Sequence, residues 1–139
     1  MKKIIALILI ALGFFLGYQV RGGEPLVVNG PEVATSTVSF IINPGAGYAE
    51  VIPNAELRSG DNLFESLSRA TKGKGVELSY KDYGGSMGMF LTSIGSTSAS
   101  GDKWWQYWVN GQYANVGVST YKPQPKDVIE FRLTNQQTI

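Results

Sequence analysis

An Asn-Gly pair between two runs of β-forming residues is the feature that most constrains this chain. Asn110 and Gly111 separate residues 104–109, which read WWQYWV, from residues 112–116, which read QYANV. Such a pair is the strongest short-range signal for a β-hairpin with a two-residue turn, because both turn positions need a positive φ. The turn length fixes the register and predicts these facing pairs: Val109 with Gln112, Trp108 with Tyr113, Tyr107 with Ala114, Gln106 with Asn115 and Trp105 with Val116.

Period-two alternation divides the hairpin side chains between two faces. The first face is almost entirely apolar and is expected to pack on the core; it holds Trp105, Tyr107, Val109, Ala114 and Val116. The second face combines aromatic rings with amides; it holds Trp104, Gln106, Trp108, Tyr113 and Asn115. Two interpretations of this second face stay open. Another segment covers it as core, or it is a stacking surface for a flat or sugar-like ligand with Trp104 and Trp108 partly exposed.

One amphipathic helix is predicted, with Asp61 or Asn62 as its N-terminal cap. Asn62 and Glu65 have the spacing of a capping box, and Leu63, Leu67 and Ala70 form an apolar stripe. Gly73 and Gly75 end the helix. About three turns are too short to be stable alone, so the helix needs a sheet to cover. The expected core residues are Leu63, Phe64, Leu67, Tyr107, Val109 and Phe131.

The remaining strands follow from β-branched and aromatic runs. Residues 37–42 and 48–52 flank turn chemistry at 43–47, and Pro53 ends the second strand or marks a sheet edge. The other predicted strands are residues 76–80, 87–94 and 128–133. Residues 95–103 are a polar loop.

The N-terminal segment has the features of a membrane signal. Lys2 and Lys3 precede the uncharged residues 4–20, and no small-residue cleavage site follows. We expect residues 1–20 to be an uncleaved, single-pass anchor in the cell membrane, with a cleaved signal peptide of a secreted protein or a buried core helix as alternatives. The flanking charges place the rest of the chain outside the cytoplasm. Residues 21–36 form a linker and residues 37–139 the exported domain.

The lack of His and Cys and the small net charge exclude several classes of function. The 139 residues contain no His and no Cys, which removes Ser–His and Cys–His nucleophiles, imidazole metal sites, disulfides and thiolate chemistry. A formal charge of +1 gives no strong attraction to nucleic acid. Carboxylate pairs such as Glu77 with Asp82 and Asp127 with Glu130 are ordinary strand-end acids. We therefore expect no enzyme, no resident cofactor and no metal site.

The C-terminal half resembles a known family through its motifs. The string WWQYWVNGQYANVGVSTY, followed by KDVIEFRL, resembles the DUF4430 family, the transcobalamin-like C-terminal domain that forms the β-domain of cobalamin carriers. Residues 61–67 fit the capped helix of this family, and residues 80–94 fit its middle strands. The resemblance covers roughly residues 37–134. It implies an α+β fold in which a β-grasp-like mixed sheet packs on one helix.

The resemblance also implies where ligands bind. Contacts would come from the hairpin and the loop after it, which here means Trp104, Gln106, Trp108, Tyr113, Gly117, Val118, Ser119 and Tyr121. The helical barrel that forms the other half of the site in cobalamin carriers is absent from this chain. The expected function is a membrane-tethered extracytoplasmic ligand-binding module for a corrinoid or another flat small molecule. The alternative is a non-enzymatic interaction module that docks a protein partner or surface polymer through the same aromatic face.

Overall fold

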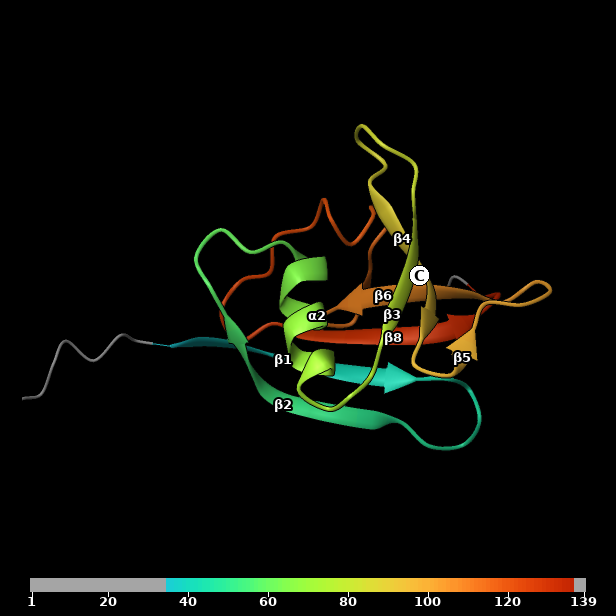
Figure 1. Cartoon of the computed structure of the whole chain (residues 1–139), viewed down its shortest axis with the longest axis horizontal. Helices are drawn as coiled ribbons and strands as arrows, with labels where there is room; N and C mark the ends of the chain where they lie inside the picture. The colour runs from blue at the N-terminus through green and yellow to red at the C-terminus, as the bar shows by residue number, and fades with distance from the viewer. Residues whose placement is uncertain (1–34, 137–139) are drawn as a thin grey trace, which may run out of the picture. The chain divides into compact units, whose positions relative to one another are not determined.

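A computed structural model describes residues 35–136, which belong to the compact unit Ala34–Ile139. The described part contains one helix, α2, and eight strands (Figure 1). Their bounds are β1 (Ser36–Asn43), β2 (Glu50–Leu57), α2 (Leu63–Lys72), β3 (Leu78–Asp82), β4 (Met89–Ile94), β5 (Thr97–Ser98), β6 (Trp104–Val109), β7 (Gln112–Tyr113) and β8 (Val128–Thr134).

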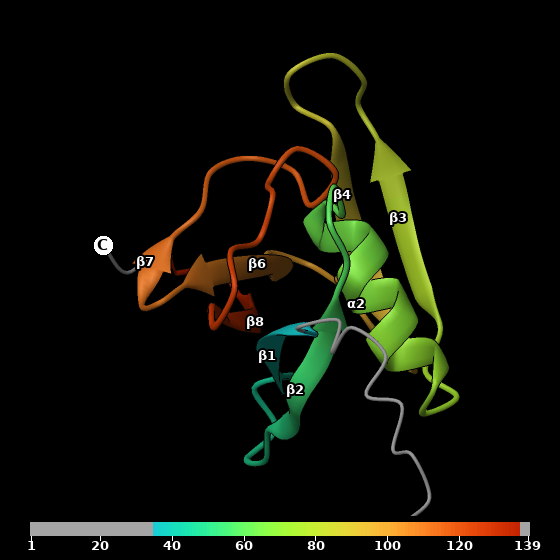
Figure 2. The same ribbon diagram turned by 90° about the vertical axis from the view of Figure 1, so that its left-hand side faces the viewer.

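The strands form two sheets. The first is five-stranded in the order β2-β1-β8-β6-β7, with β1 and β8 parallel and the other pairs antiparallel. The second is antiparallel in the order β3-β4-β5. Figure 2 shows α2 lying between the five-stranded sheet and β3. The described residues therefore form an α+β arrangement with a mixed sheet and a single helix, as expected.

The helix begins as the sequence predicts. Asn62 Oδ1 accepts a hydrogen bond from Glu65 N–H at 2.9 Å, and Glu65 Oε2 accepts one from Asn62 N–H at 2.9 Å. This capping box satisfies a helical donor that would otherwise lack a partner. Leu63 and Leu67 are completely buried, so the apolar stripe faces the core.

The core forms between the helix and the five-stranded sheet. Alternate residues of β1, namely Val38, Phe40 and Ile42, point inward and are buried. Of the predicted core residues, Leu63, Leu67, Tyr107 and Phe131 are buried, and Phe64 and Val109 pack against them while partly exposed.

Pro53 lies inside an edge strand and does not end it. β2 runs through Pro53 to Leu57, and its residues pair with β1 on one side only. A bulge opposite Ser39 takes up Pro53 and Asn54, and Asn54 has a φ of 53°. Proline is tolerated because no neighbouring strand needs its missing N–H.

The predicted membrane anchor lies outside the described residues. Within residues 35–136, no helix is both long and apolar enough to cross a membrane.

Candidate functional site

The hairpin around Asn110 and Gly111 forms, but it is shorter than the register predicts. Trp108 pairs with Tyr113 and Val109 pairs with Gln112, as expected. The further pairs Gln106–Asn115 and Trp105–Val116 were wrong, because β7 has only two residues. After Ala114 the chain turns toward β4, where Gly117 N–H donates to Met87 O at 3.0 Å.

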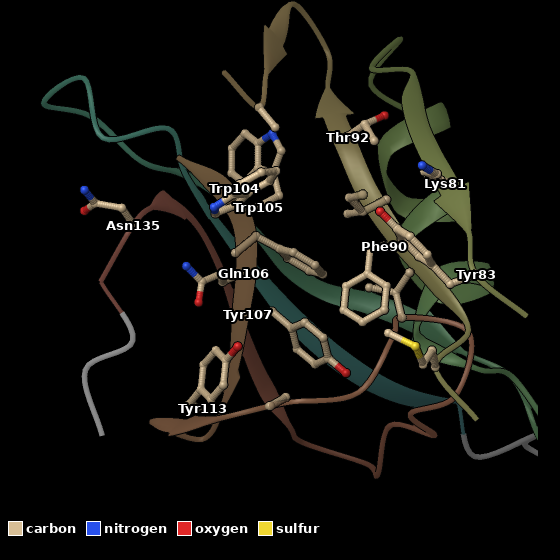
Figure 3. A pocket seen from close by; sticks show the side chains of 16 residues that line it. Lys81, Tyr83, Phe90, Thr92, Trp104, Trp105, Gln106, Tyr107, Tyr113 and Asn135 are labelled. Atoms are coloured by element: carbon tan, nitrogen blue, oxygen red, sulfur yellow. The ribbon is translucent and has the colours of Figure 1, made fainter. Parts of the chain in front are cut away.

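This early departure of β7 leaves a cleft between β4 and β6. The cleft has a volume of about 670 Å³, and seven of its sixteen lining residues are aromatic (Figure 3). We call it the β4–β6 cleft. Its lining residues are Lys81, Tyr83, Met87, Phe90, Leu91, Thr92, Ala99, Trp104, Trp105, Gln106, Tyr107, Tyr113, Ala114, Val118, Phe131 and Asn135.

The floor of the cleft is held in place by hydrogen bonds. Trp105 Nε1 donates to Thr97 O at 3.1 Å, and Tyr107 Oη donates to Val116 O at 2.8 Å. Burial raises the pKa of Tyr107 well above its ordinary value, with Tyr121 and Tyr113 adding to the shift. The phenol therefore stays neutral, and the floor presents fixed, uncharged aromatic rings.

The rim is aromatic and open to solvent. Trp104 is 60% exposed and Tyr83 is 54% exposed. Figure 3 shows Trp104 on the β6 side of the cleft, with Lys81, Tyr83 and Phe90 on the opposite side. Tyr83 packs edge-on against Phe90, with ring centroids 5.7 Å apart, and Lys81 Nζ lies 5.1 Å from the Tyr83 ring. Rings on both sides can stack on a flat ligand.

Gln106 adds a polar group to the wall. Its Nε2 donates to Thr134 O at 2.8 Å. Its Oε1 is buried and has no hydrogen-bond donor in the described part of the chain. A buried acceptor without a donor costs free energy.

Trp108 is buried, so for this residue the interpretation of the second hairpin face as a partly exposed stacking surface was wrong. Only 2% of Trp108 is exposed. The Arg132 guanidinium lies 4.3 Å from its ring centroid, and Tyr113 packs edge-on at 5.4 Å. Trp108 therefore contributes packing and does not line the cleft, whereas Trp104, on the same strand face, does.

The predicted loop residues Gly117, Val118, Ser119 and Tyr121 connect β4 with α2. Val118 N–H donates to Met89 O at 2.8 Å, and Val118 O and Tyr121 O accept from the first two helical N–H groups, those of Phe64 and Leu63. Ser119 Oγ accepts from Met89 N–H at 2.9 Å. Of these four residues only Val118 lines the cleft.

The Tyr121 side chain joins a network around Asp127. Tyr121 Oη donates to Asp127 Oδ2 at 2.8 Å, and Asn110 Nδ2 donates to Asp127 Oδ1 at 2.8 Å. Burial, together with Asp127, raises the pKa of Tyr121 to about 12. This network ties the hairpin turn to the start of β8.

Two of the other acidic side chains considered above, Glu130 and Asp82, also have local partners. Glu130 accepts from Arg132 at 2.7 Å, and this contact lowers the pKa of Glu130. Asp82 Oδ1 accepts from Gly84 N–H at 2.8 Å. Within the described ranges, no group of three Asp and Glu side chains is placed to hold a metal ion.

The β3–β4 side of the cleft was missed by the sequence reasoning. Phe90 lies in a segment that the sequence predicts only as a strand, and Lys81 and Tyr83 lie between two predicted strands. The available signal was Tyr83 and Phe90, which lie on either side of Gly84 and Gly85. Nothing local shows that this hairpin lies opposite β6.

Comparison with known proteins places these observations in a family. The model of the domain of unknown function DUF4430 matches residues 60–135, which is more than half of the chain. No curated protein matches.

Solved structures share the fold at low sequence identity. A candidate metal-binding protein from Ruminococcus gnavus ATCC 29149 superimposes with a TM-score of 0.56 and 15% identity, covering 71% of this chain and 96% of that one. Haptocorrin in complex with Cbi superimposes with a TM-score of 0.61 and 15% identity over 73% of this chain. The chain spans only 25% of haptocorrin. The match to its model shows that this chain belongs to the DUF4430 family.

Proposed function

We propose that the domain is a non-catalytic module that binds a flat small molecule in the β4–β6 cleft. The observation that carries the proposal is the pair of aromatic walls, with Trp104 exposed on one side and Tyr83 on the other. Clefts of several hundred cubic ångströms with apolar walls and few polar groups are typical ligand sites. The Gln106 amide and the Lys81 ammonium would orient the ligand.

A corrinoid is the first ligand to test. The similarity to haptocorrin in complex with Cbi supports the choice at the level of fold. The order β2-β1-β8-β6-β7, with its parallel central pair, supports the finer assignment of a β-grasp-like domain. The chain contains no His, so its own side chains would supply no imidazole to the cobalt. Binding would rest on stacking and on amide contacts.

The test is an isothermal calorimetric titration of the full-length chain with cobalamin and cobinamide. Trp104→Ala should weaken binding by about tenfold, since the ring supplies stacking worth about 0.5–1.5 kcal/mol beyond its buried area. Tyr48→Ala is the matched control, because Tyr48 is 73% exposed and does not line the cleft. Absence of heat with both corrinoids would exclude this ligand class. Equal binding by the Trp104 variant would exclude this site.

We also propose that residues 4–20 tether the domain to the outer face of the cell membrane. The proposal rests on the uncharged run after Lys2 and Lys3. Mass spectrometry of the membrane fraction should find a mature protein that retains residues 4–20. A soluble product whose N-terminus lies between residues 17 and 30 would contradict the tether.

A further inference from the structure

The β3–β4 side of the cleft presents three polar groups that can donate hydrogen bonds. Lys81 lies in β3, Tyr83 directly follows β3, and Thr92 lies in β4. All three residues line the cleft and are exposed. Figure 3 shows them on the same side of the cleft, opposite β6. We call the Lys81 ammonium, the Thr92 hydroxyl and the Tyr83 phenol the donor cluster.

No other protein group occupies the donor cluster in the described part of the chain. There, Lys81 Nζ, Thr92 Oγ1 and Tyr83 Oη take part in no hydrogen bond and no ion pair. By contrast, Arg69 and Arg132 each hold a carboxylate, at 2.9 and 2.7 Å. The Lys81 ammonium lies 5.1 Å from the Tyr83 ring centroid, and such a contact uses none of its three N–H donors. The cluster is therefore free to bind an acceptor on a ligand.

The charges around the cleft favour a negative group at the donor cluster. Among the residues that line the cleft, Lys81 is the one that carries a charge. Asp82 follows it in the chain but does not line the cleft, and its carboxylate accepts from Gly84 N–H at 2.8 Å. Asp102 accepts from Asn135 Nδ2 at 2.6 Å, and Figure 3 shows Asn135 on the other side of the cleft from Lys81. An anion is therefore attracted toward Lys81 and repelled from the Asn135 side.

We propose that the ligand of the β4–β6 cleft is a flat molecule with a carboxylate, and that this carboxylate binds to the donor cluster. The inference rests on the proposed function, because the ring must occupy the cleft for its substituent to reach Lys81. A carboxylate has two oxygens that accept several hydrogen bonds, and it pairs with an ammonium. A carboxamide of the same shape has one accepting oxygen and no charge. The cluster therefore selects the acid over its amide.

The test compares acids with their amides on the same ring, by calorimetric titration of the full-length chain at neutral pH. One pair is cobyric acid and cobinamide, and the other is 1-pyrenebutyrate and 1-pyrenebutyramide. In each pair that binds, the acid should bind about three- to fivefold more tightly than the amide, as expected for one partly solvated ion pair. The preference should fall below about twofold in about 0.5 M NaCl, because salt screens exposed charges.

Variants of the chain test the residues of the donor cluster. Lys81→Gln removes the ammonium and should abolish the preference for the acid, while the affinity for the amide stays within about twofold of wild type. Thr92→Val and Tyr83→Phe each delete one hydroxyl and keep the shape of the side chain, and each should reduce the preference. Lys122→Gln is the matched control, because it changes the net charge equally at an exposed residue that does not line the cleft. This control should keep the wild-type preference.

The outcomes separate this inference from the proposed function. Failure of all four compounds to bind would overturn both. Equal affinities for acid and amide in a pair that binds would overturn the carboxylate subsite and leave the cleft as a binding site. A preference for the acid that persists in Lys81→Gln, or that Lys122→Gln also abolishes, would overturn the subsite too, because the attracting charge would then lie elsewhere on the protein.

Discussion

Arg132 lies over Trp108, with its guanidinium carbon 4.3 Å from the ring centroid. The two residues come from the neighbouring strands β8 and β6, and Glu130 holds the same guanidinium at 2.7 Å. A planar guanidinium can stack on an aromatic face while it pairs with a carboxylate. This relationship places a cation over a ring that alternation assigns to the second hairpin face, for which the sequence left both a covered and an open position possible.

We predict that Arg132→Ala lowers the free energy of unfolding by about 0.5–2 kcal/mol, because it removes both the cation–π contact and the pair with Glu130. Arg132→Lys should recover only part of the loss, since an ammonium does not stack. Arg58→Ala is the control. Arg58 also pairs with a glutamate, but its side chain is 60% exposed, so the loss should stay below about 0.5 kcal/mol. Urea melts measure all three, and equal losses for Arg132→Ala and Arg58→Ala would contradict the prediction.

Substitutions at Trp104 and Trp108 should affect different properties, ligand binding for Trp104 and stability for Trp108. Trp108→Ala should cost about 3–5 kcal/mol of unfolding free energy, because it empties a buried site. Trp104→Ala should change stability by less than about 0.5 kcal/mol, because most of that ring is exposed. Denaturant melts provide the comparison, and a large loss on Trp104→Ala would mean that this ring is structural.

Gly117 should be intolerant of even a methyl group. A Cβ there would overlap Met87 O and lie 2.6 Å from Met89 O, and both are backbone atoms. We expect Gly117→Ala to cost about 1–3 kcal/mol, as overpacking does elsewhere. Gly73→Ala is the matched control. Gly73 has a φ of −60°, and its nearest neighbour to a Cβ lies at 3.7 Å, so this change should be neutral or stabilising. Thermal melts of the two variants test the prediction, and equal changes in stability for Gly117→Ala and Gly73→Ala would contradict it.

Asp61 should make the free energy of unfolding depend on pH in the acidic range. Arg69 donates to both carboxylate oxygens of Asp61, at 2.9 and 3.0 Å, and these hydrogen bonds lower the pKa of Asp61. A lowered folded-state pKa gives stability that is present above the unfolded value of about 3.9 and is lost as the pH falls through the folded value. The stability advantage of the wild type over Asp61→Asn should therefore shrink in that range.

Arg69→Gln offers an independent check of the same contact. Removing the guanidinium should return the pKa of Asp61 toward its ordinary value. The contribution of Asp61 to the pH dependence of the unfolding free energy should then disappear, which urea melts at several pH values below about 5 would measure. An advantage of wild type over Asp61→Asn that stays constant across this range would show that the contact does not control acid stability.

Much of the fold could be predicted because its signals are local. The capping box at Asn62 and Glu65, the turn at Asn110 and Gly111 and the alternation along β1 each depend on neighbours within a few residues. Such patterns report directly on helix starts, hairpin register and buried faces. For this reason the Trp108–Tyr113 and Val109–Gln112 pairs of the hairpin were predicted correctly.

The cleft could not be predicted, since it depends on where distant segments meet. Alternation assigned Trp104 and Trp108 to one face, but it contains no information on Arg132, which reaches Trp108 from β8. The length of β7 depends on the contact of Gly117 with Met87, thirty residues earlier in the chain. Both are tertiary contacts, and these override local propensity.

The position of β8 has a consequence for how the chain is made. β8 lies between β1 and β6, so the two halves of the five-stranded sheet meet only through the strand that is synthesised after all its neighbours. While the ribosome is still adding residues 120–127, β1 and β6 have no strand to join them. Contacts this distant in sequence form slowly. The five-stranded sheet would thus stay incomplete until β8 emerges. A nonsense codon before Val128 would release a chain in which the β2–β1 pair and the β6–β7 pair lack the strand that joins them.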